Sequence, residues 1–435
     1  MADKDTHDRR LTALRARLAQ QQLDGWFVGR EDMYQGEEVQ PGEERLAYLT
    51  GFTGSAGFAV VLMEQAALFS DGRYTLQMQN QTNTAHWSRH TLPEQALADW
   101  VQDQAFDGLA IGIDLDLVTV TAFARLEKIF ADAGARLIGV DANPIDTIWQ
   151  GQPSPPSPAA FRLDVETAGA SMADKVQNLD LALDEAECQA VFISRVDAVN
   201  WLTNMRGRDL SCTPVMHAFA LYHRENGLVI LADAGRLAPV MQDDLAAEAT
   251  VVALADFAQL IDPRAGYDAA SRVMIDPASL PQSLFDILQE SGVELVRAAC
   301  PVTRVKAVKN TAELAGTRRA HIEDGGAMVR FLAWVDGLVP GQICETEIVD
   351  ELLAIRAASP RFICPSFETI CGAGPNGAIV HYRAIEGADS ALVADSLLLI
   401  DSGAHYSDGS TDITRTVAIG TPDERMCHAF TSVLK

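Results

Sequence analysis

The sequence predicts a multidomain protein in which two similar α/β domains are followed by an α+β region. Its 435 residues are too many for one hydrophobic core, and 48% of them are hydrophobic, enough to fill several cores. Two long segments show the same order of helix and strand patterns. A third region has helical patterns followed by strands that read as antiparallel. We therefore expect three domains, over residues 1–155, 156–302 and 303–435.

The first domain opens with an amphipathic helix, because Leu11, Leu14 and Leu18 recur at helical spacing. Strands are then expected at residues 26–28, 58–62 and 67–70, with the segment 47–52 between the first two. The domain ends near residue 155, inside the segment 152–158, which contains four prolines. Such a segment cannot continue a helix or a central strand and favours an extended linker.

The second domain repeats this order. A helix near residues 173–188 leads to a strand at 191–193 that aligns with the strand at 26–28. Residues 199–203 align with 46–50, and Asp233–Arg236 falls where Asp71–Arg73 stood. Further strands are expected at 217–222 and 228–232. We interpret the two segments as copies of one α/β unit; the alternative is a chance likeness between two ordinary α/β domains.

The third region begins with a helix whose start is marked by the capping-box sequence Asn310–Glu313. The apolar residues Leu314, Ile322, Val329 and Leu332 then fall on one stripe, and the helix is expected to stop at Gly337. A shorter helix before Pro360 carries the apolar residues Ile348, Leu352 and Ile355. A glycine-rich loop at 372–377 follows and is expected to feed a strand carrying His381.

Composition limits the partners and the compartment. Lys and Arg number 34 against 60 Asp and Glu, giving a net charge of −26 that repels nucleic acids and anionic membranes. The seven cysteines show no CxxC pair, as is usual in a reducing cytosol. The charged N-terminus lacks the apolar core of a signal peptide. We expect a cytoplasmic protein with no nucleic-acid or membrane partner.

The segment 397–419 carries the most specific chemical signal. The apolar residues 397–400 indicate a strand, 407–409 a turn and 411–419 a returning strand, so the segment is predicted to form a β-hairpin. An even number of residues separates Asp401 from Asp412, which lets them face each other as a cross-strand pair. Two metal ions held roughly 3.5 to 4 Å apart need such paired carboxylates. A calcium-binding turn, or two surface carboxylates beside a tight hairpin, are the alternatives.

Two further residues are candidates. His381 precedes the Asp401 strand, where its imidazole could donate to a substrate carbonyl, although a histidine in an apolar strand is more often a core residue. Arg73 follows a strand in a loop, where it could bind a substrate carboxylate or bridge domains. The loop 372–377 lacks the spacing of a phosphate-binding loop, and Ser402 lacks the GxSxG context of a serine nucleophile.

The motifs at 401–416 and 376–382 resemble the catalytic core of the Xaa-Pro aminopeptidase P family, the long three-domain form among the pita-bread metallopeptidases. Residues 52–57 and 71–74 are similar to the first domain of the same form. The resemblance implies two creatinase/prolidase N-terminal-type α/β domains before a pita-bread catalytic domain. It also implies hydrolysis of the bond between an N-terminal residue and a following proline, by two-metal activation of a bridging water.

By position, the resemblance implies that Asp401 and Asp412 are metal ligands, with Asp412 bridging both ions. It implies that His381 is catalytic and binds substrate near the scissile carbonyl, and that Arg73 reaches the peptide from the first domain. The implied cofactors are two divalent ions, expected to be Mn²⁺, and the implied partners are peptides with proline at the second position, with a homodimer as one assembly.

The remaining ligands of that family, one histidine and two glutamates, and a second substrate-binding histidine have no counterpart in this sequence. We therefore expect these 435 residues to carry an incomplete pita-bread domain, truncated within the catalytic part, and to be inactive alone. Two alternatives stay open. One is a non-catalytic pita-bread module that binds peptides or proteins, and the other is a metal-independent creatinase-type hydrolase; the paired aspartates argue against both.

Overall fold

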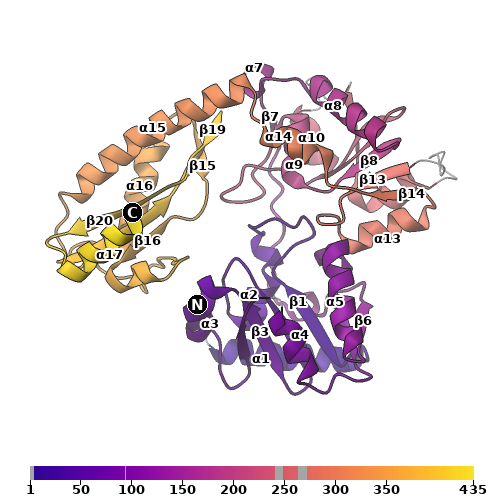
Figure 1. Cartoon of the computed structure of the whole chain (residues 1–435), viewed down its shortest axis with the longest axis horizontal. Coiled ribbons are helices and arrows are strands. Elements are labelled where there is room, and N and C mark those ends of the chain that lie inside the picture. Colours follow the sequence, from indigo (N-terminus) through magenta and orange to yellow (C-terminus); the bar gives the residue numbers. More distant parts are fainter. Residues whose placement is uncertain (1–3, 94, 241–247, 263–271) are drawn as a thin grey trace. The chain divides into compact units, whose positions relative to one another are not determined.

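The computed structural model describes residues 4–93, 95–240, 248–262 and 272–435. The chain forms two compact units, each with its own sheets (Figure 1). The first comprises Met1–Leu163, Ala170–Leu210 and Val215–Val308, and the second comprises Asp164–Gly169, Ser211–Pro214 and Lys309–Lys435. None of the helices in the described part of the chain combines the length and hydropathy needed to span a bilayer.

The first α/β domain is a three-layer sandwich within the first unit. Its six-stranded sheet has the order β4-β3-β2-β1-β5-β6. One face carries the core formed with α1, where Leu11, Leu14 and Leu18 are fully buried as predicted, and the other is covered by α4 and α5. The elements are α1 (Lys4–Gln20), β1 (Gly25–Gly29), α2 (Arg45–Thr50), β2 (Phe58–Leu62), β3 (Ala66–Ser70), α3 (Thr75–Gln81), β4 (Ser88–Thr91), α4 (Gln95–Gln102), β5 (Ala110–Ile113), α5 (Val120–Asp132), β6 (Arg136–Gly139) and α6 (Pro144–Ile148).

The second α/β domain is built from the same pieces. Its elements are β7 (Phe161–Arg162), α8 (Met172–Glu185), β8 (Ala190–Ile193), α9 (Val196–Thr203), β9 (Met205–Arg206), β10 (Phe219–His223), β11 (Gly227–Leu231), α10 (Ala234–Val240), β12 (Ala249–Val252), α12 (Phe257–Leu260), β13 (Arg272–Ile275), α13 (Gln282–Glu290), β14 (Glu294–Arg297) and α14 (Pro301–Ala307). Short β7 and β9 pair with each other, and the other six strands form one sheet.

The two sheets have the same topology, which confirms the predicted duplication. The second sheet has the order β12-β11-β10-β8-β13-β14. In both, the third strand of this order (β2 or β10) is antiparallel to its two neighbours, and the other pairings are parallel. The aligned aspartates also agree, because Asp71 and Asp233 each accept a bond from the backbone N–H two residues later. Shared topology and shared turn chemistry make chance likeness a poor explanation.

Backbone bonds join the two α/β domains of the first unit. The amide of Val120, at the start of α5, donates to the carbonyl of Leu280 over 3.0 Å. The amide of Gln282, at the start of α13, donates to the carbonyl of Val118 over 2.8 Å. Val120 also packs in the apolar core of the second domain. The start of α5 is therefore part of both domains.

The second unit contains long helices and two small sheets. Its elements are α7 (Val165–Ala168), α15 (Thr311–Val335), α16 (Glu345–Ala357), β15 (Phe362–Pro365), β16 (Ile370–Ala373), the 3₁₀-helix η7 (Gly374–Ala378), β17 (Ser396–Ser402), β18 (Ala404–Tyr406), β19 (Gly409–Ser410), β20 (Ile413–Ile419) and α17 (Glu424–Leu434). The sheets have the orders β16-β17-β20 and β15-β18-β19. Helices α15 and α16 supply the apolar core behind the first sheet.

The start of α15 is as predicted, but its predicted apolar stripe is wrong for three of its four residues. Leu332, the fourth, is partly buried against the core. Asn310 and Glu313 form the capping box, with bonds of 2.9 and 2.8 Å between side chain and backbone. Ile322 and Val329 of the expected stripe are 77% and 68% exposed, and Leu314 is exposed too. The buried side of α15 consists instead of Gly316, Ala320, Asp324, Ala327, Met328, Phe331 and Val335.

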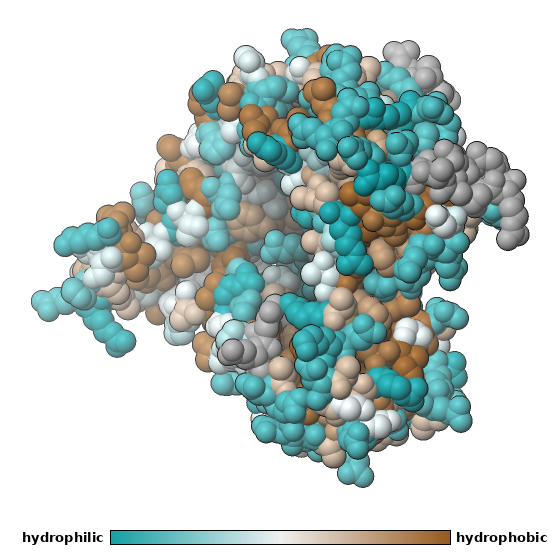
Figure 2. Space-filling view, turned by 45° about the vertical axis from the view of Figure 1, so that its right-hand side comes forward, coloured by the Kyte–Doolittle hydropathy of each residue, from teal (hydrophilic) through white to brown (hydrophobic). Residues whose placement is uncertain are grey.

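Small residues decide which side of α15 is buried. A Cβ on Gly316 would meet the carbonyl oxygen of Asp408 at 2.1 Å, so the helix and the strand β19 region approach too closely for a larger residue. In α16 the prediction is correct for Ile348 and Leu352, which are buried. Hydrophilic residues cover much of the face shown in Figure 2, with apolar residues scattered among them, as the acidic composition implies.

Candidate metal centre

Asp401 lies near the end of the central strand of the β16-β17-β20 sheet. Burial alternates along β17, so Leu398, Ile400 and Ser402 face the core while Asp401 lies on the other, more open face. Its direct neighbour on β20 is Thr414, whose hydroxyl donates to the Asp401 carboxylate over 2.7 Å. The carboxylate is thus oriented by a neighbouring strand and still half accessible to solvent.

Asp412 is exposed and lies immediately before β20. The prediction that it directly opposes Asp401 is wrong, because the observed register pairs Asp401 with Thr414 and Ser402 with Ile413. Continued by one step, this register puts Asp412 across from Gly403. The prediction that both aspartates share a face agrees with the register, since Asp412 and Thr414 are two residues apart in extended chain. Diagonal neighbours of this kind have Cα atoms roughly 7 to 8 Å apart.

The turn explains the shifted register. Tyr406 pairs with Gly409, so the turn consists of Ser407 and Asp408, and the strands β18 and β19 around it belong to the second small sheet with β15. The predicted hairpin therefore exists, but its tip leaves the sheet that carries Asp401. A shift by two residues preserves the face of every side chain, because side chains alternate with a period of two.

A buried ion pair holds the segment between the two aspartates. Asp324 of α15 and Arg356 of α16 form a bidentate pair of 2.8 and 3.1 Å, and both residues are 2% exposed. The same carboxylate accepts bonds from the hydroxyls of Tyr406 and Thr411, each over 2.9 Å. Burial, with Asp324 close by, raises the pKa of Tyr406, so its hydroxyl remains a donor.

This network reaches the neighbours of both candidate ligands. Arg356 donates to the carbonyl of Gly403 over 3.3 Å, two residues after Asp401. Thr411 directly precedes Asp412, and its hydroxyl also accepts from the amide of Ala404 over 3.1 Å. Helices α15 and α16 thereby hold the chain just after Asp401 and just before Asp412. The sequence analysis did not identify Asp324 or Arg356. The available signal was that Asp324 recurs at helical spacing with the small residues on the buried side of α15.

His381 does not lie on a strand, so that prediction is wrong. Strand β16 ends at Ala373, the glycine-rich segment forms η7, and His381 follows in a turn. His381 is partly buried. The glycines explain the difference: a Cβ on Gly372 would meet the backbone of Gly377 at 2.6 Å, so the chain folds back tightly here instead of extending. His381 therefore depends on loop contacts, not on a sheet, for its position.

Arg73 belongs to the first unit, whereas His381, Asp401 and Asp412 belong to the second. It lies in a 3₁₀ turn after β3 and makes a bidentate contact with Asp71, with distances of 3.0 Å from Nε and 2.7 Å from Nη2. Both side chains are well exposed, so the ion pair is weak and easily exchanged for another anion. The guanidinium of Arg73 is thus oriented by Asp71 and remains accessible to solvent.

The donor set fits part of a metal site. Asp401 and Asp412 offer hard carboxylate oxygens on one face, as divalent ions such as Mn²⁺ require. Within the described residues, no three His, Cys, Asp or Glu side chains gather in a group that could hold a metal ion. The two aspartates therefore fit a metal as two of its ligands and leave the remaining coordination positions unfilled by this part of the chain.

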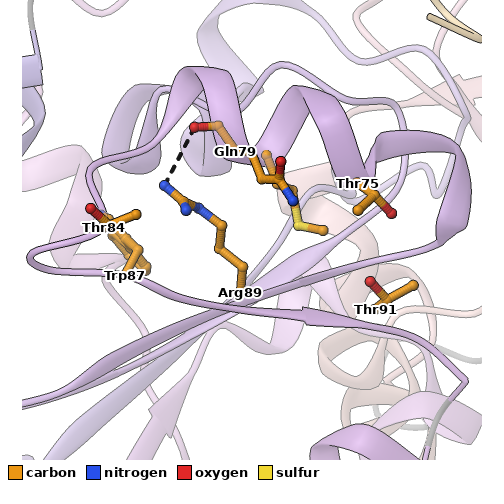
Figure 3. A pocket seen from close by; sticks show the side chains of 7 residues that line it. Thr75, Gln79, Thr84, Trp87, Arg89 and Thr91 are labelled. Atoms are coloured by element: carbon orange, nitrogen blue, oxygen red, sulfur yellow. Dashed lines mark hydrogen bonds between the residues drawn. The ribbon is translucent and has the colours of Figure 1, made fainter. Parts of the chain in front are cut away.

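Two cavities occur in the described residues, one in the first domain and one in the second unit. A cavity of about 350 Å³ in the first domain is lined by Thr75, Met78, Gln79, Thr84, Trp87, Arg89 and Thr91. Figure 3 shows Arg89 reaching across it to the backbone carbonyl of Gln79, a contact of 3.5 Å. A second cavity, of about 390 Å³ beside α15 and α16, includes Arg356 and Tyr406 of the buried network. Neither cavity is lined by a candidate site residue.

Family models match almost the whole chain. Residues 10–148 and 151–313 each match the creatinase/prolidase N-terminal domain, and residues 315–435 match metallopeptidase family M24. The two N-terminal matches coincide with the two α/β domains of the first unit. The fold class predicted from the sequence, two such domains before a pita-bread domain, is therefore confirmed.

Whole-chain relatives point the same way. The chain is 34% identical over 448 residues to a probable Xaa-Pro aminopeptidase P of Aspergillus niger, covering all of this chain and 72% of the relative. A probable Xaa-Pro aminopeptidase P of Coccidioides posadasii is also 34% identical, with 98% and 71% covered. The solved X-prolyl aminopeptidase of Caenorhabditis elegans, described as a cytosolic enzyme with a di-nuclear active site, matches with a TM-score of 0.88 at 26% identity. That match covers 97% of this chain and 71% of the other.

Proposed function

Since this chain belongs to the Xaa-Pro aminopeptidase P family of M24 metallopeptidases, we propose that it carries part of an enzyme that removes the N-terminal residue from peptides with proline at the second position. The observation that supports this most strongly is the arrangement of Asp401 and Asp412 on one face, with Thr414 bonded to the first and a buried ion pair holding the segment between them. Such support is what a metal ligand needs to keep its orientation.

Each candidate residue has a defined role in this proposal. Asp401 and Asp412 would hold two divalent ions, proposed to be Mn²⁺, and these ions, when bound, would activate water and polarise the scissile carbonyl. His381 donates a hydrogen bond to the substrate near that carbonyl. Arg73 binds the peptide through its guanidinium fork.

The 435 residues by themselves are proposed to bind metal weakly and to lack turnover, because the described part of the chain brings no three metal-ligating side chains together. We also propose a cytoplasmic location, supported by the scattered cysteines without a CxxC pair and by the description of the nematode enzyme as cytosolic. The domain limits near residues 155 and 302, and a homodimer as the assembly, belong to the same proposal.

Metal titration tests the proposal. Calorimetry with Mn²⁺, and hydrolysis of an Ala-Pro-containing peptide, would be measured on the 435-residue chain and on the product of the whole reading frame that contains it. We expect tight binding of two ions and turnover only in the latter, and loss of both in Asp401→Asn and Asp412→Asn. Asp132→Asn, at an exposed ion pair of the first unit, is the matched control.

The other outcomes separate the alternatives. Turnover that needs no metal would replace the proposal with a creatinase-type hydrolase. Absence of both metal uptake and turnover in the whole product would replace it with a non-catalytic binding module.

A further inference from the structure

The segment that carries His381 is a long connection with little regular structure of its own. It joins β16 to β17 and contains only η7 before the turn at His381. Backbone N–H and C=O groups in such a segment need partners from elsewhere, or the segment will not hold one conformation. The turn at His381 closes on itself, because the amide of Tyr382 donates to the carbonyl of Ile379 over 3.2 Å. Its place in the fold then depends on which groups outside the segment anchor it.

A single buried carboxylate accepts bonds from two backbone amides and two side chains of this connection. Glu345, the first residue of α16, is 0% exposed. Its Oε1 accepts from the amide of Ala373 over 2.6 Å and from Asn376 Nδ2 over 2.9 Å. Its Oε2 accepts from the hydroxyl of Tyr382 over 2.8 Å and from the amide of Ser390 over 2.9 Å. One side chain thus contacts the start, the middle and the end of the segment.

The donors around Glu345 are all uncharged groups, which is an unusual setting for a buried carboxylate. Its negative charge is offset by four hydrogen-bond donors and by its place at the N-terminus of α16, where the helix dipole favours an anion. Burial, with Glu345 next to it, raises the pKa of Tyr382, so the tyrosine hydroxyl donates at neutral pH. Asn376 adds a further tie, because Nδ2 also donates to the Tyr382 hydroxyl oxygen over 3.0 Å.

Neighbouring contacts fix the end of the segment to the same helix start. Thr346 donates from its hydroxyl to Asp389 over 2.6 Å. The amide of Leu392 donates to the carbonyl of Ile343 over 2.8 Å. Among the groups bonded to Glu345, Tyr382 is the one next to His381 in the sequence.

We propose that Glu345 is a positioning residue for His381, acting through Tyr382: its carboxylate fixes the turn so that the imidazole is presented to the substrate. The proposal rests on the substrate-binding role proposed above for His381. A neutral amide at position 345 would not serve, because its NH₂ group would face the donors that now point at a carboxylate oxygen. The shape of the turn, and not only the stability of the unit, therefore depends on the two acceptor oxygens of this carboxylate.

Two variants test the proposal. Glu345→Gln removes one acceptor oxygen, and Tyr382→Phe removes only the hydroxyl that links the turn to Glu345. Tyr222→Phe is the matched control, because the Tyr222 hydroxyl donates to a carboxylate, that of Asp180, over 2.7 Å in the first unit. The first readout is the His381 imidazole signal in ¹H–¹³C NMR spectra of the chain, which needs neither metal nor activity.

We expect Tyr382→Phe to shift and broaden the His381 signal, whereas Tyr222→Phe leaves it unchanged. In the product of the whole reading frame, Tyr382→Phe should raise the KM for a Xaa-Pro peptide about tenfold, the usual worth of one bond to a charged group. Its Mn²⁺ affinity should stay the same, because Asp401 and Asp412 lie outside this segment. In a His381→Ala background, Tyr382→Phe should have no further effect on KM.

Contrary results are equally definite. An unchanged His381 signal in Tyr382→Phe, or an effect on KM that persists in full without His381, would overturn the positioning role. If Glu345→Gln does not fold, Tyr382→Phe alone decides. Failure of the parent protein to hydrolyse Xaa-Pro peptides would count against the proposed function, while the NMR comparison would still decide whether Glu345 and Tyr382 fix His381.

Discussion

Thr414 lies directly opposite Asp401 and donates its hydroxyl to the carboxylate over 2.7 Å. This bond restricts rotation of the side chain proposed to bind metal, and partners of this kind typically change metal affinity by 10- to 100-fold. We expect Thr414→Val to weaken Mn²⁺ binding about tenfold in calorimetric titration. Thr416→Val is the control, because Thr416 lies on the same face opposite Leu399. Equal affinities in the two variants would contradict this role for Thr414.

The buried pair of Asp324 and Arg356 should be costly to break from one side. Arg356→Met leaves a carboxylate buried without its cation, for which about 3 to 5 kcal/mol of unfolding free energy is expected to be lost. Arg319→Met removes an exposed partner of Asp408 and should cost less than about 1 kcal/mol. Urea unfolding of both variants provides the comparison. A loss in Arg356→Met no larger than in Arg319→Met would show that the pair does not hold the hairpin.

His217 should make the first unit less stable in acid. Burial lowers the pKa of His217 to about 4, although Asp209 nearby opposes this. The folded pKa lies below the unfolded value of 6.5, so the unfolded chain binds the proton first, and stability falls between about pH 6.5 and 4. We expect the unfolding free energy of the parent to fall by roughly 3 kcal/mol relative to that of His217→Gln across this window. The measurement is the unfolding free energy as a function of pH.

Asp32 should act in the opposite direction. Burial raises the pKa of Asp32 to about 6, above its ordinary value of 3.8. The stability associated with its protonated form is complete below pH 3.8 and is lost as the pH rises through about 6. Asp32→Asn keeps an oxygen for the amide of Tyr34, which now donates over 2.9 Å. We expect this variant to be more stable than the parent by about 1 to 3 kcal/mol at pH 8 and by little at pH 4.

Arg73 should affect peptide binding and not metal binding. If the guanidinium fork reaches the substrate, Arg73→Ala raises the KM for Xaa-Pro peptides in the product of the whole reading frame, and Arg73→Lys restores little because it lacks the fork. The Mn²⁺ affinity should be unchanged in both. Arg9→Ala, which removes an arginine that contacts Thr6 on α1, is the control. An unchanged KM in Arg73→Ala would limit Arg73 to its contact with Asp71.

Local sequence patterns determined much of this protein. The spacing of Leu11, Leu14 and Leu18 determines the buried side of α1. The capping box of Asn310 and Glu313 determines the start of α15. The repeated order of elements predicted two equivalent sheets, which the topology confirms. The even spacing of Asp401 and Asp412 predicted one common face. Each of these features depends on helix or strand periodicity, or on a cap within a few residues, and such interactions are local in the chain.

Tertiary structure alone decided the register, the buried side of α15 and the surroundings of His381. A turn at Ser407 and Asp408 places Thr414 opposite Asp401. The even spacing of the two aspartates predicts a shared face but does not specify which residue pairs with Asp401. The close approach of Gly316 to Asp408 turns Ile322 and Val329 outward despite their apolar spacing. Glu345 and Asp324 become the centres of their networks only when helices meet loops far away in sequence. These outcomes depend on long-range contacts, whose partners no local pattern specifies.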